Sequence, residues 1–456
     1  MTVSETFRKK SVFGNNTVAL LVLITVALAL AIDTYFAKQF LFSQTTVSES
    51  INTFTIISII CIVGQYLLLA FVSYKSQAVL SKIRRLRLTY FSVLIGQNFV
   101  VVLFVTLLLQ VHLTSSYNSS IAVSASLIAY SLAFVVILYL AQLFFSWFRI
   151  NRHKAILLYA LSSTSICVNL GISLTLTAIS LPVLPTEVYS TAAWFRPNLV
   201  PGSLAITIFF NTAYLISTIV SFIVTWIATA ILLRHYSKKI GKILYWLIMS
   251  LPLAYFLSQF LSLSAEQILP LGDPVGSIIL LTLLFSLSRP IGGAVFGIAF
   301  LDTARRIKDE AVRGYMLTSA FGFTLFFISS QIVGTALPIS PFPPFGFPAV
   351  LFTGLSSYLV LVGIYSSAVS VSHDMKLRQT MRRAATNEAR WVESIASAEM
   401  EHEIVEKVMS TTRENEHILA QETGIRPSLG EDDLIEYLEE VVKELKIEKE
   451  KKKSQQ

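Results

Sequence analysis

The sequence predicts an all-α fold: a polytopic transmembrane helix bundle of about ten spans with a cytoplasmic helical tail. Hydrophobic residues make up 54% of the 456 positions and charged residues only 14%, whereas soluble chains carry roughly 25% charged residues. Apolar runs of about 20 residues, the length that crosses a hydrocarbon core about 30 Å thick, recur along the chain. Positive charge gathers in alternate loops. Together these observations exclude a soluble globule.

Ten apolar segments are predicted to span the bilayer and to form one transmembrane domain over residues 17–371. The first follows a basic N-terminus, residues 1–16, and we expect it to be retained, because it is long for a signal-peptide core and no small-residue cleavage site follows it. The segments are 17–37, 53–74, 89–112, 121–147, 155–181, 204–233, 243–264, 275–301, 314–337 and 349–371.

The loop charges predict the orientation of these segments. Nineteen Lys and Arg residues lie at the N-terminus and in every second loop, against two, Lys38 and Arg196, in the other loops. Cytoplasmic loops accumulate positive residues, so both termini are predicted to be cytoplasmic in a cell membrane, and no nucleic acid is needed to explain the basic balance. The nineteen are Arg8, Lys9, Lys10, Lys75, Lys82, Arg84, Arg85, Arg87, Arg149, Arg152, Lys154, Arg234, Lys238, Lys239, Lys242, Arg305, Arg306, Lys308 and Arg313.

Two predicted outer loops, 182–203 and 338–348, are rich in proline and aromatic residues. Proline prevents a regular helix, and the aromatic content is high for a free loop. We expect both loops to lie on the membrane surface or to dip between helices. They would either cap the bundle by packing or act as a lid over a ligand.

Arg289 is the charged residue nearest to the middle of a predicted span. Insertion scales assign a free-energy cost of about 2.5 to 3.5 kcal/mol to a charged side chain at such a position. We therefore expect a polar group to contact the guanidinium. Pro290, Gly292 and Gly293 follow, and they predict a kinked or broken helix. The second half would begin at Pro290, with Ser288 or Arg289 at its cap, and its N-terminus and the guanidinium would form an anion site.

A structural role for Arg289 stays open beside the anion site. Amide side chains near the middle of other spans could satisfy it, among them Gln65, Gln97, Asn98 and Asn169. An ion pair with Asp33 or Glu266 is a further alternative. We expect Asp33 itself to lie near the outer interface, where it can reach water.

The sequence contains few residues or motifs that are typical of a catalytic site. Cys61 and Cys167 lie inside apolar runs and are expected to be packing residues without a disulfide bond. No paired histidine motif, nucleophile elbow or phosphate-binding loop is present. We therefore expect no enzyme activity, no cofactor and no metal site.

The tail is predicted to be helical in two parts. Residues 372–422 contain neither proline nor glycine and continue the last span, 423–430 form a linker, and 431–456 form a short amphipathic helix with a basic end. A heptad pattern over 377–419 predicts a coiled-coil stalk in which Glu388, His402 and Glu416 could set the register. The stalk would form a parallel homodimer, fold on the basic inner loops, or stay a single helix. Residues 431–448 would dock within the protein or on a cytoplasmic partner.

Three functions fit this organisation. A sensor or signalling scaffold would relay the state of the bundle through the last span to the stalk. A secondary transporter or channel would bind an anionic or polar solute at Arg289, with Ser288, Pro290, Gly292, Gly293, Gln65 and Asn169 as candidate site residues. A structural subunit of a membrane complex is the third.

Overall fold

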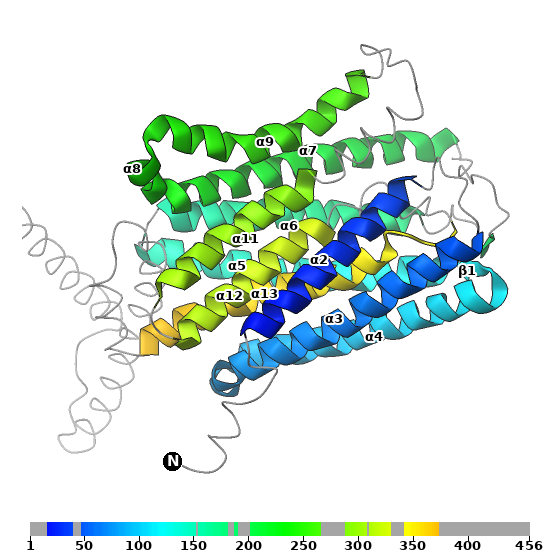
Figure 1. Ribbon diagram of the computed structural model, residues 1–456, viewed down its shortest axis with the longest axis horizontal. Coiled ribbons are helices and arrows are strands. Elements are labelled where there is room, and N and C mark those ends of the chain that lie inside the picture. The colour runs from blue at the N-terminus through cyan, green and yellow to red at the C-terminus, as the bar shows by residue number, and fades with distance from the viewer. Residues whose placement is uncertain are drawn as a thin grey trace, which may run out of the picture.

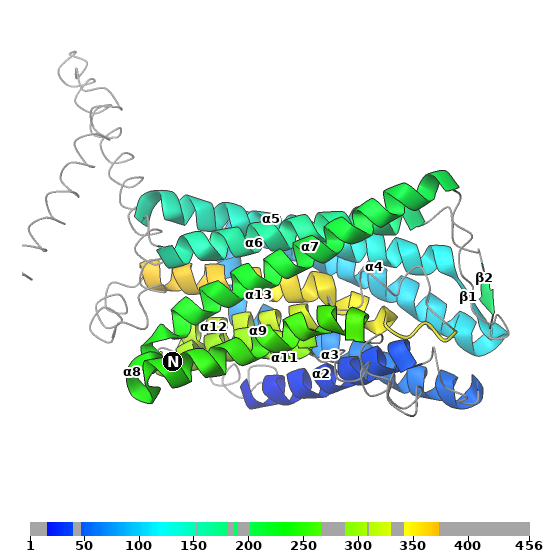
Figure 2. The ribbon, with the colours of Figure 1, turned by 90° about the horizontal axis from the view of Figure 1, so that it is seen from above.

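The computed structural model describes residues 16–39, 47–151, 154–180, 187–189, 201–265, 288–307, 310–329 and 342–373. Within these ranges the chain is almost entirely helical, and the long helices run side by side (Figures 1 and 2). The predicted stalk, linker and terminal helix lie outside the described residues beyond 373. Glu388, His402 and Glu416 are among them.

A long helix covers most of each segment that was predicted to span the membrane, although the described part of the eighth begins only at Ser288. The ten helices are α2 (Asn16–Gln39), α3 (Val47–Lys82), α4 (Arg84–Thr114), α5 (Ser119–Asn151), α6 (Lys154–Ser180), α7 (Pro201–Leu232), α9 (Lys242–Ala265), α11 (Ser288–Arg306), α12 (Glu310–Ser329) and α13 (Phe347–His373). Within the described residues, eight helices are long and apolar enough to cross a membrane, and α9 and α11 are not among them.

Short non-helical turns join neighbouring helices at both ends of the bundle. Ile83 has an extended backbone between α3 and α4, and Ser115 ends α4 in the left-handed conformation, at φ 49°. After it, β1 (Ser116–Asn118) pairs antiparallel with β2 (Glu187–Tyr189), so two predicted outer loops meet at one end of the bundle. At the other end the 3-10 turn η2 (Leu233–Tyr236) and α8 (Ser237–Ile240) connect α7 to α9 (Figure 1).

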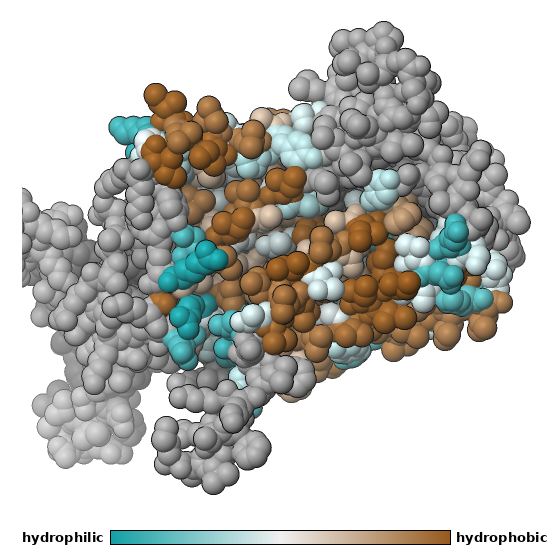
Figure 3. Space-filling view, in the orientation of Figure 1, coloured by the Kyte–Doolittle hydropathy of each residue, from teal (hydrophilic) through white to brown (hydrophobic). Residues whose placement is uncertain are grey.

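The outer surface of the bundle suits lipid. On α4 the exposed apolar residues recur every three or four positions and form one stripe, which includes Leu88, Phe91, Ile95, Phe99 and Val102. The space-filling view shows hydrophobic residues across the middle of the visible face and hydrophilic residues towards its ends (Figure 3). Because hydrocarbon is the solvent in which such a band is stable, the chain is a multi-pass membrane protein.

Helix α13 forms the centre of the bundle. It packs against α2, α3, α4, α5 and α12, and all of its apolar stretch is buried, against 33% for α4. The last described helix is therefore surrounded by the helices that precede it in the chain (Figures 1 and 2).

Two glycines bring α12 and α13 into backbone contact. A Cβ atom added to Gly322 would lie 2.6 Å from the backbone nitrogen of Val360, and one added to Gly363 would lie 2.6 Å from the carbonyl oxygen of Tyr315. Small residues allow this approach, which membrane helices use because van der Waals packing holds them together. The α12–α13 contact leaves no room for a side chain at either glycine.

The described part of the second proline-rich loop dips into the bundle. Residues 342–346 are buried, and Gly346 has a φ of 93° that lets the chain turn into α13. Phe345 stacks on Phe36 at a ring-centroid distance of 5.2 Å and meets the edge of Phe54 at 5.6 Å. Of the two predicted placements, this segment therefore adopts the one between helices.

The inward turn overturns the expectation that Asp33 reaches water. Asp33 is 0% exposed, and the backbone N–H of Gly346 donates to both carboxylate oxygens at 3.0 Å. The prediction relied only on the position of Asp33 along α2. It was wrong because the turn before α13 folds against the same height of α2 and covers the side chain.

Candidate functional site

The interface between α6 and α7 carries polar side chains at helical spacing. Ser162, Asn169 and Ser173 lie on α6, and their neighbours on α7 include Ser217 and Thr225. Residues three or four apart share one helix face, so these short polar groups line a seam between the two helices. The hydroxyl groups of Ser162 and Thr225 are 2.6 Å apart across it.

Asn169 makes the densest set of contacts in this seam. Its side-chain nitrogen donates to the hydroxyl oxygens of Ser217 at 2.8 Å and Thr218 at 2.9 Å, and it lies 3.3 Å from the carbonyl oxygen of Tyr214. Asn169 was predicted as a mid-span polar residue. The structure shows that α7 satisfies its amide nitrogen.

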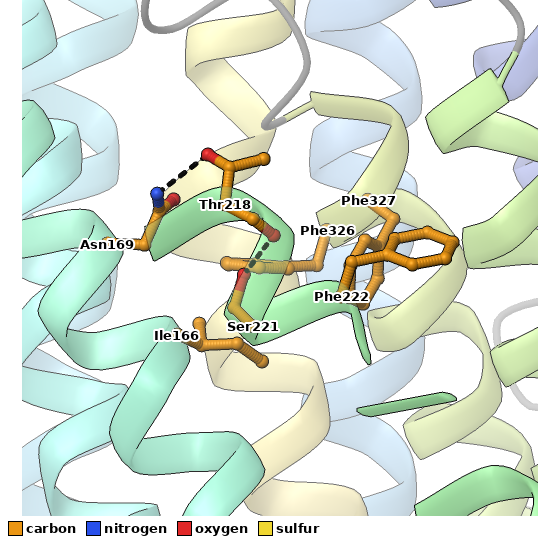
Figure 4. A pocket seen from close by; sticks show the side chains of 7 residues that line it. All are labelled: Ile166, Asn169, Thr218, Ser221, Phe222, Phe326 and Phe327. Carbon is orange, nitrogen blue, oxygen red and sulfur yellow. Dashed lines mark hydrogen bonds between the residues drawn. The ribbon is translucent and has the colours of Figure 1, made fainter. Parts of the chain in front are cut away.

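A cavity opens beside this hydrogen-bonded cluster, between α6, α7 and α12 (Figure 4). Its volume of about 20 Å³ holds roughly one water molecule. One wall is polar and comes from α6 and α7, while α12 supplies an aromatic wall. The lining residues are Ile166, Asn169, Thr218, Ser221, Phe222, Phe326 and Phe327.

Phe222 connects the cavity to the helices around it. Its ring stacks on Phe256 of α9 at a centroid distance of 3.8 Å and also contacts Phe296 of α11 and Phe327 of α12. Because aromatic rings are rigid and well packed, movement of one wall of the cavity must be accommodated by three neighbouring helices.

The glycines that follow Arg289 pack directly on the cavity wall. A Cβ atom added to Gly292 would overlap the ring of Phe222, and one added to Gly293 would overlap Phe327. Thus one predicted site residue, Asn169, lines the cavity, and two others, Gly292 and Gly293, pack against its wall residues Phe222 and Phe327.

The other residues of the predicted anion site are described only in part. Ser288, Arg289 and Pro290 form the first turn of α11 as described, one turn before the glycines. Pro290 is half-buried, and the side chains of Ser288 and Arg289 lie outside the described part of the structure. Residues 275–287 lie outside the described ranges. The helix break and the anion site therefore stay predictions.

Gln65 belongs to a different interface. It is 0% exposed in α3, which packs against α2, α4, α12 and α13, and neither of its side-chain polar atoms has a hydrogen-bond partner within the described chain. Gln97 of α4 donates to the carbonyl oxygen of Leu351 in α13 at 2.5 Å. The structure thus places Gln65 away from the α6–α7 seam that holds Asn169.

The sequence prediction missed the aromatic wall and the hydroxyl partners of Asn169. Phe222, Phe326 and Phe327 look like ordinary core residues in an apolar run. The spacing of Thr218, Ser221 and Thr225 on α7 was the available signal, since the three recur at intervals of three and four residues. Both cysteines are free and buried, which confirms that prediction.

Comparison with protein-family models, curated proteins and solved structures finds no match for the chain. Within the described ranges, no group of three or more His, Cys, Asp or Glu residues is placed to hold a metal ion. The class that the fold defines is a multi-pass helical membrane protein with a small cavity inside its bundle, polar on one side and aromatic on the other.

Proposed function

We propose that this protein is a non-enzymatic membrane sensor that relays the state of the α6–α7–α12 cavity through α13 to its C-terminal tail. In this proposal the chain crosses a cell membrane about ten times, with both termini in the cytoplasm. The tail forms the output, either as a homodimeric stalk over 377–419 or through a partner that binds 431–448.

One observation supports the proposal: α12, which forms the aromatic wall of the cavity, also makes close backbone contact with α13. Phe326 and Phe327 line the cavity, and one turn earlier on α12 Gly322 meets the backbone of α13. A packed interface of this kind transmits displacement, because it has no free volume to absorb it. A change in cavity occupancy is therefore expected to move α13.

The chemistry of the cavity limits its ligand to a small polar or anionic solute. Ser221 lines the cavity and donates its hydroxyl hydrogen to the carbonyl oxygen of Thr218, which leaves its own oxygen as an acceptor. A solute with N–H or O–H groups would donate to this acceptor, and we propose that Arg289 binds the charge of an anionic solute. The volume of about 20 Å³ requires the walls to move apart for anything larger than water.

Pulsed electron paramagnetic resonance tests the relay. Spin labels would replace Arg84, exposed at the start of α4, and Ser370, half-buried near the end of α13, after both native cysteines are changed to alanine. We expect at least one of chloride, acetate, inorganic phosphate and glycine to shift the distance between the labels. The shift should vanish in Asn169→Leu, because leucine removes the amide group from the polar wall.

Asn98→Leu is the matched control. Asn98 is also a mid-span amide, but it is exposed and bonds to Tyr66 and to the carbonyl oxygen of Leu94, outside the cavity. This variant should keep the full shift. An unchanged distance with every solute, or the same shift in Asn169→Leu as in the parent, would contradict the sensor proposal.

A transporter or channel for the same class of solute is the second candidate. The observation that favours it is a row of buried hydroxyls that continues along α7 from Thr218 through Ser221 and Thr225 to Thr229. Uptake of the active solute into proteoliposomes, lowered at least tenfold by Arg289→Ala, would support transport. Equal uptake in the parent and the variant, or none in either, would remove this candidate.

A further inference from the structure

Asp33 is a buried carboxyl group that neither the cavity nor the proposed relay uses. It lies in α2, has no exposed surface, and takes part in one contact that joins α2 to the turn before α13. Charged groups at such positions are rare within membrane helices, and where they occur they commonly bind protons or ions.

The hydrogen bonds around Asp33 do not match the needs of an ionised carboxylate. An ionised carboxylate offers about four acceptor sites, whereas the hydrogen bonds within the described residues supply one N–H, that of Gly346, shared between both oxygens. Among the side chains that the structure describes, no Lys, Arg or His forms an ion pair with Asp33. A proton would neutralise the group and leave only one O–H donor to be satisfied in place of the unmet acceptor sites of a carboxylate.

The neighbouring elements offer little else that titrates. From α3, the buried thiol of Cys61 is the titratable group near Asp33, and Glu49 lies exposed near the start of the helix. Tyr35 follows on α2 itself. The turn 342–346, the first eleven residues of α13 and the second half of α12 contain no acidic, basic, cysteine or tyrosine side chain.

The wall around the Gly346 contact also disfavours a metal cation. The aromatic rings of Phe36, Phe54 and Phe345 pack together there, and hard cations require several oxygen ligands. Of the ligands that can neutralise a carboxylate, the proton is the one that this setting accommodates.

We propose that Asp33 is a proton-binding site whose occupancy holds the turn at 342–346 against α2. The neutral carboxyl keeps its carbonyl oxygen as acceptor for Gly346 and stays dry. When the proton leaves to bulk water, the carboxylate is stabilised only if water enters, so the turn moves away and frees the start of α13. Acid therefore favours the closed turn and alkali the open one.

Infrared difference spectroscopy on the full chain in lipid bilayers tests the proton site. We expect the parent protein to show a protonated-carboxyl band at neutral pH that converts to carboxylate absorption on alkalinisation. The band should shift with ¹³C-labelled aspartate, be lost in Asp33→Asn, and persist in the control Asp302→Asn at the far end of α11. If Asp33→Asn is not recovered folded, Asp33→Glu should move the band.

Hydrogen exchange at the 345–347 amides, corrected for the intrinsic pH dependence of exchange, tests the turn. Protection should fall as pH rises in the parent and in Asp302→Asn, and should stay constant in Asp33→Asn. Absence of the band at neutral pH, its survival in Asp33→Asn, its loss when sodium replaces choline, or pH-dependent protection without Asp33 would each overturn the proposal.

Discussion

Gly363→Ala is expected to destabilise the bundle by about 2 to 3 kcal/mol, the upper range for an overpacked core. The added methyl group would lie 2.6 Å from the carbonyl oxygen of Tyr315, and backbone atoms cannot move aside as a flexible side chain can. Alanine is the better helix former by about 1 kcal/mol, so any loss of stability must come from the helix contact. Thermal unfolding in mild detergent, followed by loss of the monodisperse particle, measures the change.

Gly171→Ala provides the control for this substitution. Gly171 lies in α6, and a Cβ atom there would meet the ring of Phe134 at 3.4 Å, an ordinary contact. The control is expected to unfold at or slightly above the temperature of the parent. If Gly363→Ala were as stable as Gly171→Ala, the backbone contact between α12 and α13 would be wrong.

Phe345→Ala is expected to lower stability by about 3 kcal/mol, as large-to-small changes in packed cores do. Phe345 is completely buried in the inward turn, and its ring contacts Phe36 of α2 and Phe54 of α3. Truncation would leave a cavity between the turn and two helices, α2 and α3, that lie far earlier in the chain. The same unfolding measurement applies, and protection of α2 amides from hydrogen exchange should fall with it.

The matched control is Phe209→Ala. Phe209 is 66% exposed on α7 and faces outward, where lipid tails replace the lost ring. We expect a change of less than about 1 kcal/mol, because apolar contacts with lipid and with protein are similar in energy. Equal effects of the two truncations would show that residues 342–346 do not enter the bundle.

The positions of the helices were predictable because each is a local property. A run of about 20 apolar residues between charged loops is sufficient to predict a membrane helix. The packing order was not predictable in the same way. The apolar stretch of α13 is slightly less hydrophobic than that of α4, yet all of it is buried against one third for α4. Hydropathy measures suitability for a membrane and does not distinguish lipid from protein as the neighbour.

The candidate site was predictable in part for the same reason. Asn169 stands out as an amide in an apolar run, and Gly292 and Gly293 stand out as small residues, but their partners depend on which helices meet. Gln65 met the same criterion as Asn169 and lies in another interface. The error over Asp33 arose likewise, since its environment is made by a turn more than 300 residues later in the chain.

The relay, the α12 contact and the Asp33 site all depend on α13 being enclosed by other helices and shielded from lipid. Carbene footprinting of the parent protein in nanodiscs, with a lipid-soluble diazirine and peptide mass spectrometry, tests it without any substitution. We expect modification of α4 at lipid-facing residues such as Leu88, Ile95 and Phe99, and none between residues 349 and 369. Modification along one face of α13 would place that helix against lipid and contradict the account.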